Sequence, residues 1–91
     1  MEVECKVKVS NKYGLHARAS TALGQTAAQF DSVVHLGREG SEEFVDAKSI
    51  LGIMSMGAGC GADLCLKVAG IDAEEAVKAI VALFERKFDE E

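Results

Sequence analysis

Two short segments of this 91-residue chain alternate between apolar and polar residues at every position. Residues 2–9, EVECKVKV, place three valines and a cysteine on one face and two glutamates and two lysines on the other. Residues 62–68, ADLCLKV, repeat the pattern. Because strand side chains point alternately to opposite faces, both segments are predicted strands with one buried and one solvated face. Such a sheet needs helices to cover its apolar face.

Two further segments have the spacing of amphipathic helices. Between about 17 and 30, and again over residues 73–88, apolar residues recur at steps of three and four. The first segment contains several alanines, which favour a helix that packs closely on a sheet. Asp72, followed three residues later by Glu75, resembles a capping box at the start of the second helix.

The middle of the chain is patterned less strongly. Residues 33–36, VVHL, predict a strand, 37–41, GREGS, a hairpin turn, and 42–45, EEFV, a weaker return strand. A short helix of about two turns is expected to end near Met56, and Asp46 and Ser49 before it are both N-cap residue types.

The predicted order is therefore β-α-β-β-α-β-α. It indicates an α+β open-faced two-layer sandwich, in which three helices cover one face of a four-stranded, mostly antiparallel sheet. We expect one domain over residues 1–91, because this length is close to that of a typical small domain.

Charge and hydropathy exclude several classes of partner. The formal net charge of −5 argues against nucleic acid and anionic membrane surfaces, which attract basic patches. No segment approaches the roughly 20 apolar residues of a membrane span, and the N-terminal residues do not resemble a signal peptide. We therefore expect a cytoplasmic protein without membrane insertion.

Cysteines and histidines give little indication of a metal or cofactor. Cys5, Cys60 and Cys65 are an odd number without a C-x-x-C pair, so we predict free thiols in a reducing compartment. We predict no metal site and, in the absence of nucleotide or hydrolase motifs, no cofactor. His35 lies within a predicted strand and is interpreted as a structural or surface side chain.

His16 is the first candidate for chemistry. It lies with Arg18 at the start of the first predicted helix, where free backbone N–H groups and about half a positive charge attract anions. A neutral imidazole is a competent nucleophile, and a nearby guanidinium can stabilise a phosphoryl group. The spacing alone leaves two interpretations open, a solvated helix cap or a histidine that accepts and holds a phosphoryl group.

Ser49 is the second candidate. A serine at a helix start is either a plain cap or a place where a phosphate gains from the helix dipole. The residues that follow include Ile50, Leu51, Ile53 and Met54, which are too many apolar groups for a two-turn helix to bury. We therefore expect some of them to form an exposed protein-docking surface.

Together these segments resemble those of a known family. Residues 14–20, GLHARAS, are similar to the active-site segment of HPr, the histidine-containing phosphocarrier of the bacterial phosphoenolpyruvate-dependent sugar phosphotransferase system. Residues 45–57, VDAKSILGIMSMG, resemble the regulatory-serine segment of that family. The distance between the segments, the chain length and the predicted element order also fit, so the resemblance covers essentially the whole chain.

The resemblance implies a role for each candidate. Enzyme I would phosphorylate His16 on Nδ1, Arg18 would stabilise the phosphoryl charge, and a IIA domain would receive the group. Ser49 would be the target of HPr kinase/phosphorylase in bacteria that possess this enzyme. The implied protein is a monomeric relay rather than an independent turnover enzyme. The implied docking surface contains Ala17, Ile50, Leu51 and Met54.

Two positions depart from the family pattern. Ala19 stands where the family often has proline, which leaves open the pose of the His16 ring and the transfer rate. Asp46 stands where asparagine is common, and its charge, three residues before Ser49, can disfavour a phosphoserine.

Two alternatives have the same fold. One is the nitrogen-related phosphocarrier, which uses the same histidine in regulation. The other is an interaction domain that has lost phosphoryl transfer. The retained His16 and Arg18 argue against the second alternative.

Overall fold

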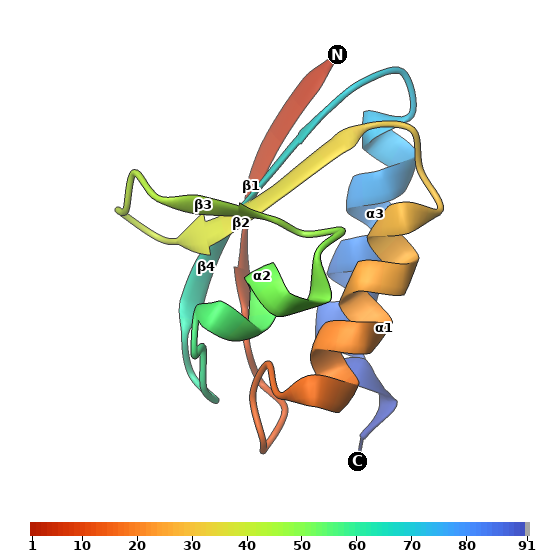
Figure 1. Cartoon of the computed structure of the whole chain (residues 1–91). Helices are drawn as coiled ribbons and strands as arrows, with labels where there is room; N and C mark the ends of the chain where they lie inside the picture. The colour runs from red at the N-terminus through yellow and green to blue at the C-terminus, as the bar shows by residue number, and fades with distance from the viewer. Residues whose placement is uncertain (91) are drawn as a thin grey trace.

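The structure, a computed structural model, describes residues 1–90 and has the element order predicted from the sequence (Figure 1). The four strands are β1 (Glu2–Lys8), β2 (Val33–Arg38), β3 (Phe44–Asp46) and β4 (Asp63–Ala69). The helices are α1 (Ala17–Ala28), α2 (Ile50–Ser55) and α3 (Ala73–Glu85), and a short 3-10 turn, η1 (Lys87–Asp89), follows α3.

The strands form one sheet in the order β1-β4-β2-β3, and the described pairings are antiparallel. The three helices lie on the same face of this sheet, with α1 beside α3 and α2 packed against α1 (Figure 1). The other face is open. The predicted open-faced two-layer sandwich is confirmed.

The alternation in the sequence corresponds to this two-sided sheet. Val7 of β1 pairs with Leu64 of β4, and both side chains are buried beneath the helices. On the open face, Glu4 pairs with Lys67, and their charged groups approach to 3.6 Å. The register therefore places apolar pairs in the core and complementary charges in solvent.

The hairpin between β2 and β3 differs from the sequence prediction. We expected a turn at 37–41, whereas β2 continues through Arg38 and β3 begins only at Phe44. Gly37 pairs with Phe44, and a Cβ on Gly37 would lie 2.6 Å from the carbonyl oxygen of Glu43. This glycine permits a close approach of two strands and does not mark a turn.

Asp72 is the N-cap residue of α3, as predicted, but the predicted capping box does not form. The Asp72 carboxylate does not cap its own helix. It accepts hydrogen bonds from the backbone N–H groups of Asp31, at 2.8 Å, and Ser32, at 2.9 Å, and from the Ser32 hydroxyl. The Ser32 hydroxyl, followed by the Asp31 amide, lowers the pKa of the Asp72 carboxyl below its ordinary value. The carboxylate thus joins the α1–β2 connection to α3.

No helix within residues 1–90 is both long enough and apolar enough to cross a lipid bilayer.

Candidate functional site

The turn that leads into α1 is fixed by a contact with the loop after α2. Gly14 has φ +69°, and a Cβ on it would lie 2.6 Å from the carbonyl oxygen of Ala58. The backbone N–H of Leu15 donates to that same oxygen at 2.9 Å. Only glycine fits this left-handed, crowded position, so the turn that presents His16 has a defined geometry.

His16 is the N-cap residue of α1. Its backbone is extended, and its Nδ1 accepts a hydrogen bond from the backbone N–H of Arg18 at 3.2 Å. An accepting Nδ1 carries a lone pair, which places the proton of the neutral ring on Nε2. The imidazole does what a serine or aspartate cap normally does, and it directs a nucleophilic nitrogen toward the positive end of the helix.

Helix α1 begins normally although Ala19 stands where the HPr family often has proline. The first helical residue is Ala17, and Ala19 is buried within the first turn. The Oγ of Ser20 donates to the carbonyl oxygen of Leu15 at 2.9 Å, which also ties the first turn to the preceding loop.

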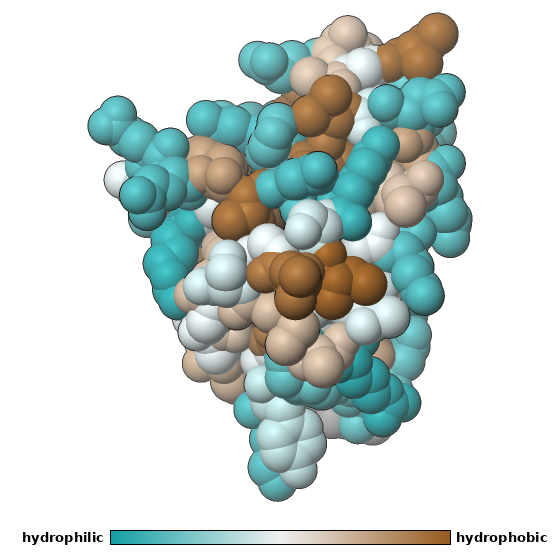
Figure 2. All heavy atoms as spheres, viewed as in Figure 1, coloured by the Kyte–Doolittle hydropathy of each residue, from teal (hydrophilic) through white to brown (hydrophobic). Residues whose placement is uncertain are grey.

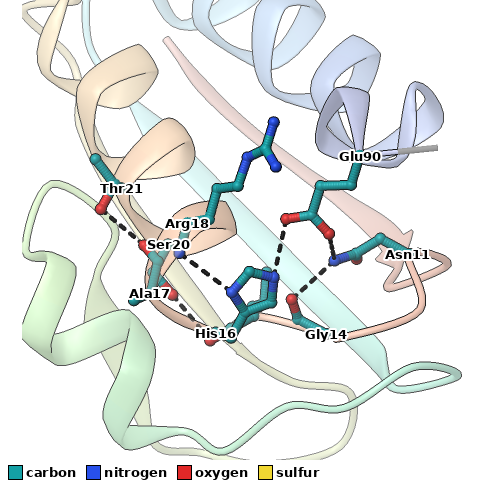
Figure 3. A network of polar contacts seen from close by, with 9 residues as sticks. Asn11, Gly14, His16, Ala17, Arg18, Ser20, Thr21 and Glu90 are labelled. Atoms are coloured by element: carbon teal, nitrogen blue, oxygen red, sulfur yellow. Dashed lines mark hydrogen bonds and ion pairs between the residues drawn. The ribbon is translucent and has the colours of Figure 1, made fainter.

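The second ring nitrogen of His16 faces a carboxylate from the end of the chain (Figure 3). Nε2 lies 2.9 Å from Oε2 of Glu90, in a side chain that is only 5% exposed, against 35% for His16. The two atoms are close but are not aligned for a hydrogen bond, so the contact becomes an ion pair only when the ring carries a positive charge.

The Glu90 carboxylate is itself held by Asn11. The Asn11 amide donates from Nδ2 to Oε1 of Glu90 at 2.9 Å and to the carbonyl oxygen of Gly14 at 2.8 Å. Neither residue was predicted from the sequence to belong to the site. Asn11 lies 79 positions from Glu90 in the sequence, so no local pattern connects them.

Arg18 is exposed on the first turn of α1. Its guanidinium points away from the imidazole ring (Figure 3). A rotation of the side chain would therefore be needed to bring the guanidinium to a group bound at Nδ1.

Ser49 is the N-cap residue of α2, as predicted. Its Oγ accepts a hydrogen bond from the backbone N–H of Gly52 at 3.0 Å, and the residue is half-buried. The Asp46 carboxylate accepts from the backbone N–H of Lys48 at 2.9 Å, so it is engaged within its own turn.

An apolar patch lies on α2 beside α1 (Figure 2). Leu51 is 80% exposed and Met54 is 39% exposed, Ile50 is half-buried, and Ile53 is fully buried. The prediction that α2 cannot bury all its apolar residues is therefore confirmed. We call Ile50, Leu51 and Met54 the α2 patch. Ala17, also expected at a docking surface, is exposed at the start of α1.

His35, Cys5 and Cys65 lie on strands of the sheet, and Cys60 lies in the loop after α2. His35 is exposed and pairs across the sheet with Asp46, which fits a surface side chain. The three cysteines are free thiols, and burial raises the pKa of Cys5 and of Cys65. Within residues 1–90, no three side chains of the metal-binding types come together.

A histidine at the mouth of a helix, beside an exposed apolar patch on an open-faced sandwich, is the arrangement of a small phosphoryl carrier. Residues 3–86 match the family model described as "PTS HPr component phosphorylation site". The chain is 47% identical over 85 residues to phosphocarrier protein HPr of Treponema pallidum, an alignment that covers 93% of this chain and 94% of that protein. The chain belongs to the HPr family of phosphocarriers of the phosphotransferase system.

A solved structure agrees with this family assignment. HPr-C-His from Thermoanaerobacter tengcongensis has a TM-score of 0.91 and 44% identity, with 98% of both chains covered. The chain is also 39% identical over 89 residues to phosphocarrier protein NPr of Shewanella violacea, covering 98% of this chain and 96% of that one. Both kinds of phosphocarrier thus match nearly the whole chain.

Proposed function

We propose that this protein relays a phosphoryl group for sugar uptake. Phosphorylated Enzyme I, charged from phosphoenolpyruvate, transfers the group to Nδ1 of His16, and His16 passes it to IIA domains. The observation that carries the proposal is the N-cap position of His16, which places the Nδ1 lone pair at the positive end of α1. Such a relay works in the cytoplasm as a monomer.

The transfer uses groups that are already at the helix start. The ring first leaves the Arg18 N–H, which frees the Nδ1 lone pair to attack phosphorus. The Nδ1–P bond forms as the bond between phosphorus and the donor breaks, and that electron pair returns to the donor. The released Arg18 N–H and the Arg18 guanidinium then stabilise the phosphoryl oxygens, since this chemistry depends mainly on positioning and charge stabilisation.

The α2 patch and Ala17 supply the docking surface for Enzyme I and the IIA domains in this proposal. The patch is exposed and apolar, and α2 packs against α1, whose first turn carries His16. A relay must bind its partners and then leave, so a small surface of this kind is suitable.

Ser49 supplies a point of regulation. HPr kinase/phosphorylase would phosphorylate its Oγ, and the phosphate oxygens would accept from backbone N–H groups at the start of α2, including that of Gly52. The added charge would lie next to Ile50 of the α2 patch and would weaken apolar docking.

Incubation with phosphoenolpyruvate and Enzyme I tests the relay. We expect acid-labile phosphate on the wild type and on His35→Ala, which removes the only other histidine, and none on His16→Ala. An unlabelled wild type alongside an active Enzyme I would refute the relay. For Ser49, ATP and the kinase replace Enzyme I, and acid-stable label that persists in Ser49→Ala would refute the assignment.

A nitrogen-branch phosphocarrier is the second candidate, favoured by the NPr relative described above. The intact Lys48-Ser49-Ile50 segment favours the sugar branch. Faster labelling by a nitrogen-branch Enzyme I than by the sugar-branch enzyme would reverse this preference.

A further inference from the structure

The Glu90 carboxylate occupies an unusual place for a charged group near a chain end. Its side chain is 5% exposed, and its two oxygens face the Asn11 amide and the His16 ring. A carboxylate with so little contact with water needs hydrogen-bond donors or a positive partner. The Asn11 amide is a neutral hydrogen-bond donor to the Glu90 carboxylate, and the His16 ring is the neighbouring group that can become positively charged.

The backbone holds Glu90 against the ring through a strained segment. Lys87, Phe88 and Asp89 have φ values of 56°, 56° and 59°, which are unfavourable for residues other than glycine. Phe88 is buried and meets the Phe84 ring edge to face at 4.9 Å between centroids. This packing anchors the turn that directs Glu90 back toward His16.

Attack by a neutral His16 ring on phosphorus creates a positive charge beside the Glu90 carboxylate. In the neutral ring the proton is on Nε2, so attack by the Nδ1 lone pair leaves a phosphoimidazolium with a net positive ring. When the group is passed on, the Nδ1–P bond breaks, the electron pair returns to Nδ1, and the ring leaves neutral with its Nε2 proton in place. A carboxylate 2.9 Å from Nε2 favours this charged ring in both directions.

We propose that Glu90 is a positioning residue for the transfer reaction, acting through Nε2 of His16. It stabilises the ring as positive charge develops, while Asn11 holds the carboxylate in place. This inference rests on the proposed phosphoryl relay.

The test compares Glu90→Gln with Asp89→Asn. Both variants remove one carboxylate from the same short segment, but Asp89 is exposed and pairs with Arg86. Rapid-quench kinetics would measure transfer from phosphorylated Enzyme I and onward to a IIA domain. For Glu90→Gln we expect kcat to fall about tenfold in both half-reactions, the size of effect expected on losing a charge-assisted contact. The KM for each partner should stay unchanged, and Asp89→Asn should behave as the wild type.

Three results would overturn this inference while leaving the relay intact. They are an unchanged kcat in Glu90→Gln, a loss that appears only in KM, and an equal loss in Asp89→Asn. Failure of the wild type to accept phosphate would instead refute the relay itself, and the role of Glu90 with it. Equal thermal unfolding midpoints for the variants and the wild type would confirm that the kinetics compare folded proteins.

Discussion

At the scale of single residues, Nδ1 of His16 has two roles that cannot be performed at once. It accepts the Arg18 N–H as a helix cap, and in the proposed function it attacks phosphorus. On phosphorylation the Arg18 N–H would lose Nδ1 as its acceptor and could donate to a phosphoryl oxygen instead. The start of α1 therefore has an acceptor in both states, and the helix need not unwind when the carrier is loaded.

Gly14 gives a prediction at this scale. Gly14→Ala should lower the free energy of unfolding by about 1–3 kcal/mol, because alanine is strained at this φ and would also crowd the Ala58 carbonyl. Urea denaturation measures the change. Gly40→Ala is a matched control, since Gly40 also has a positive φ, +85°, but open space around its Cβ position. Equal losses in the two variants would show that the Ala58 contact does not matter.

At the scale of elements, the sequence predicted best where burial alone decides the pattern. The alternation of β1 and β4 and the helical spacing of α1 and α3 directly reflect which face meets the core. The hairpin at Gly37 was misplaced because a glycine in a strand and a glycine in a turn look alike until the neighbouring strand is known. At the start of α2 the sequence offered two N-cap residue types, Asp46 and Ser49, and the structure shows that Ser49 is the cap.

The α2 patch gives a prediction at the element scale. Leu51→Ala should change the free energy of unfolding by less than about 0.5 kcal/mol, because the side chain is 80% exposed. It should raise the KM for Enzyme I roughly three- to tenfold, as expected for a residue that contributes to docking. Steady-state transfer assays measure this. Ile71→Ala, at a 90% exposed position in the turn before α3, is the control and should change neither quantity. An unchanged KM in Leu51→Ala would remove this residue from the docking surface.

At the scale of the whole molecule, contacts between distant segments determine what the sequence could not show. The sequence around Asp72 has a local capping pattern. The Asp72 carboxylate nevertheless accepts hydrogen bonds from Asp31 and Ser32, which lie about half the chain away in sequence. Glu90 joins the site in the same way, through a partner at the opposite end of the chain. The sequence therefore singled out His16 as the candidate but did not reveal the groups around its second ring nitrogen.

The Asp72 contact predicts how stability depends on pH. Its folded-state pKa is lowered, so its contribution is present above the ordinary carboxyl value of about 4 and is lost as the pH falls through the folded-state pKa. Asp72→Asn should therefore show a smaller loss of stability than the wild type on acidification below about pH 4. Urea denaturation across this pH range measures the difference. Asp31→Asn, which retains the backbone N–H donor, should follow the wild type, and an identical acid profile in Asp72→Asn would contradict the assignment.

The bond between the Leu15 N–H and the Ala58 carbonyl has a consequence for how such carriers diverge. Both atoms belong to the main chain, so the link between the histidine turn and the loop after α2 requires a glycine at position 14 but does not depend on the exposed side chains of α2. The exposed residues of α2 can therefore mutate while the position of His16 is kept, so that in the proposed function partner preference can change without moving the phosphoryl acceptor. One scaffold can in this way give rise to lineages that differ in their clients and share the same chemistry.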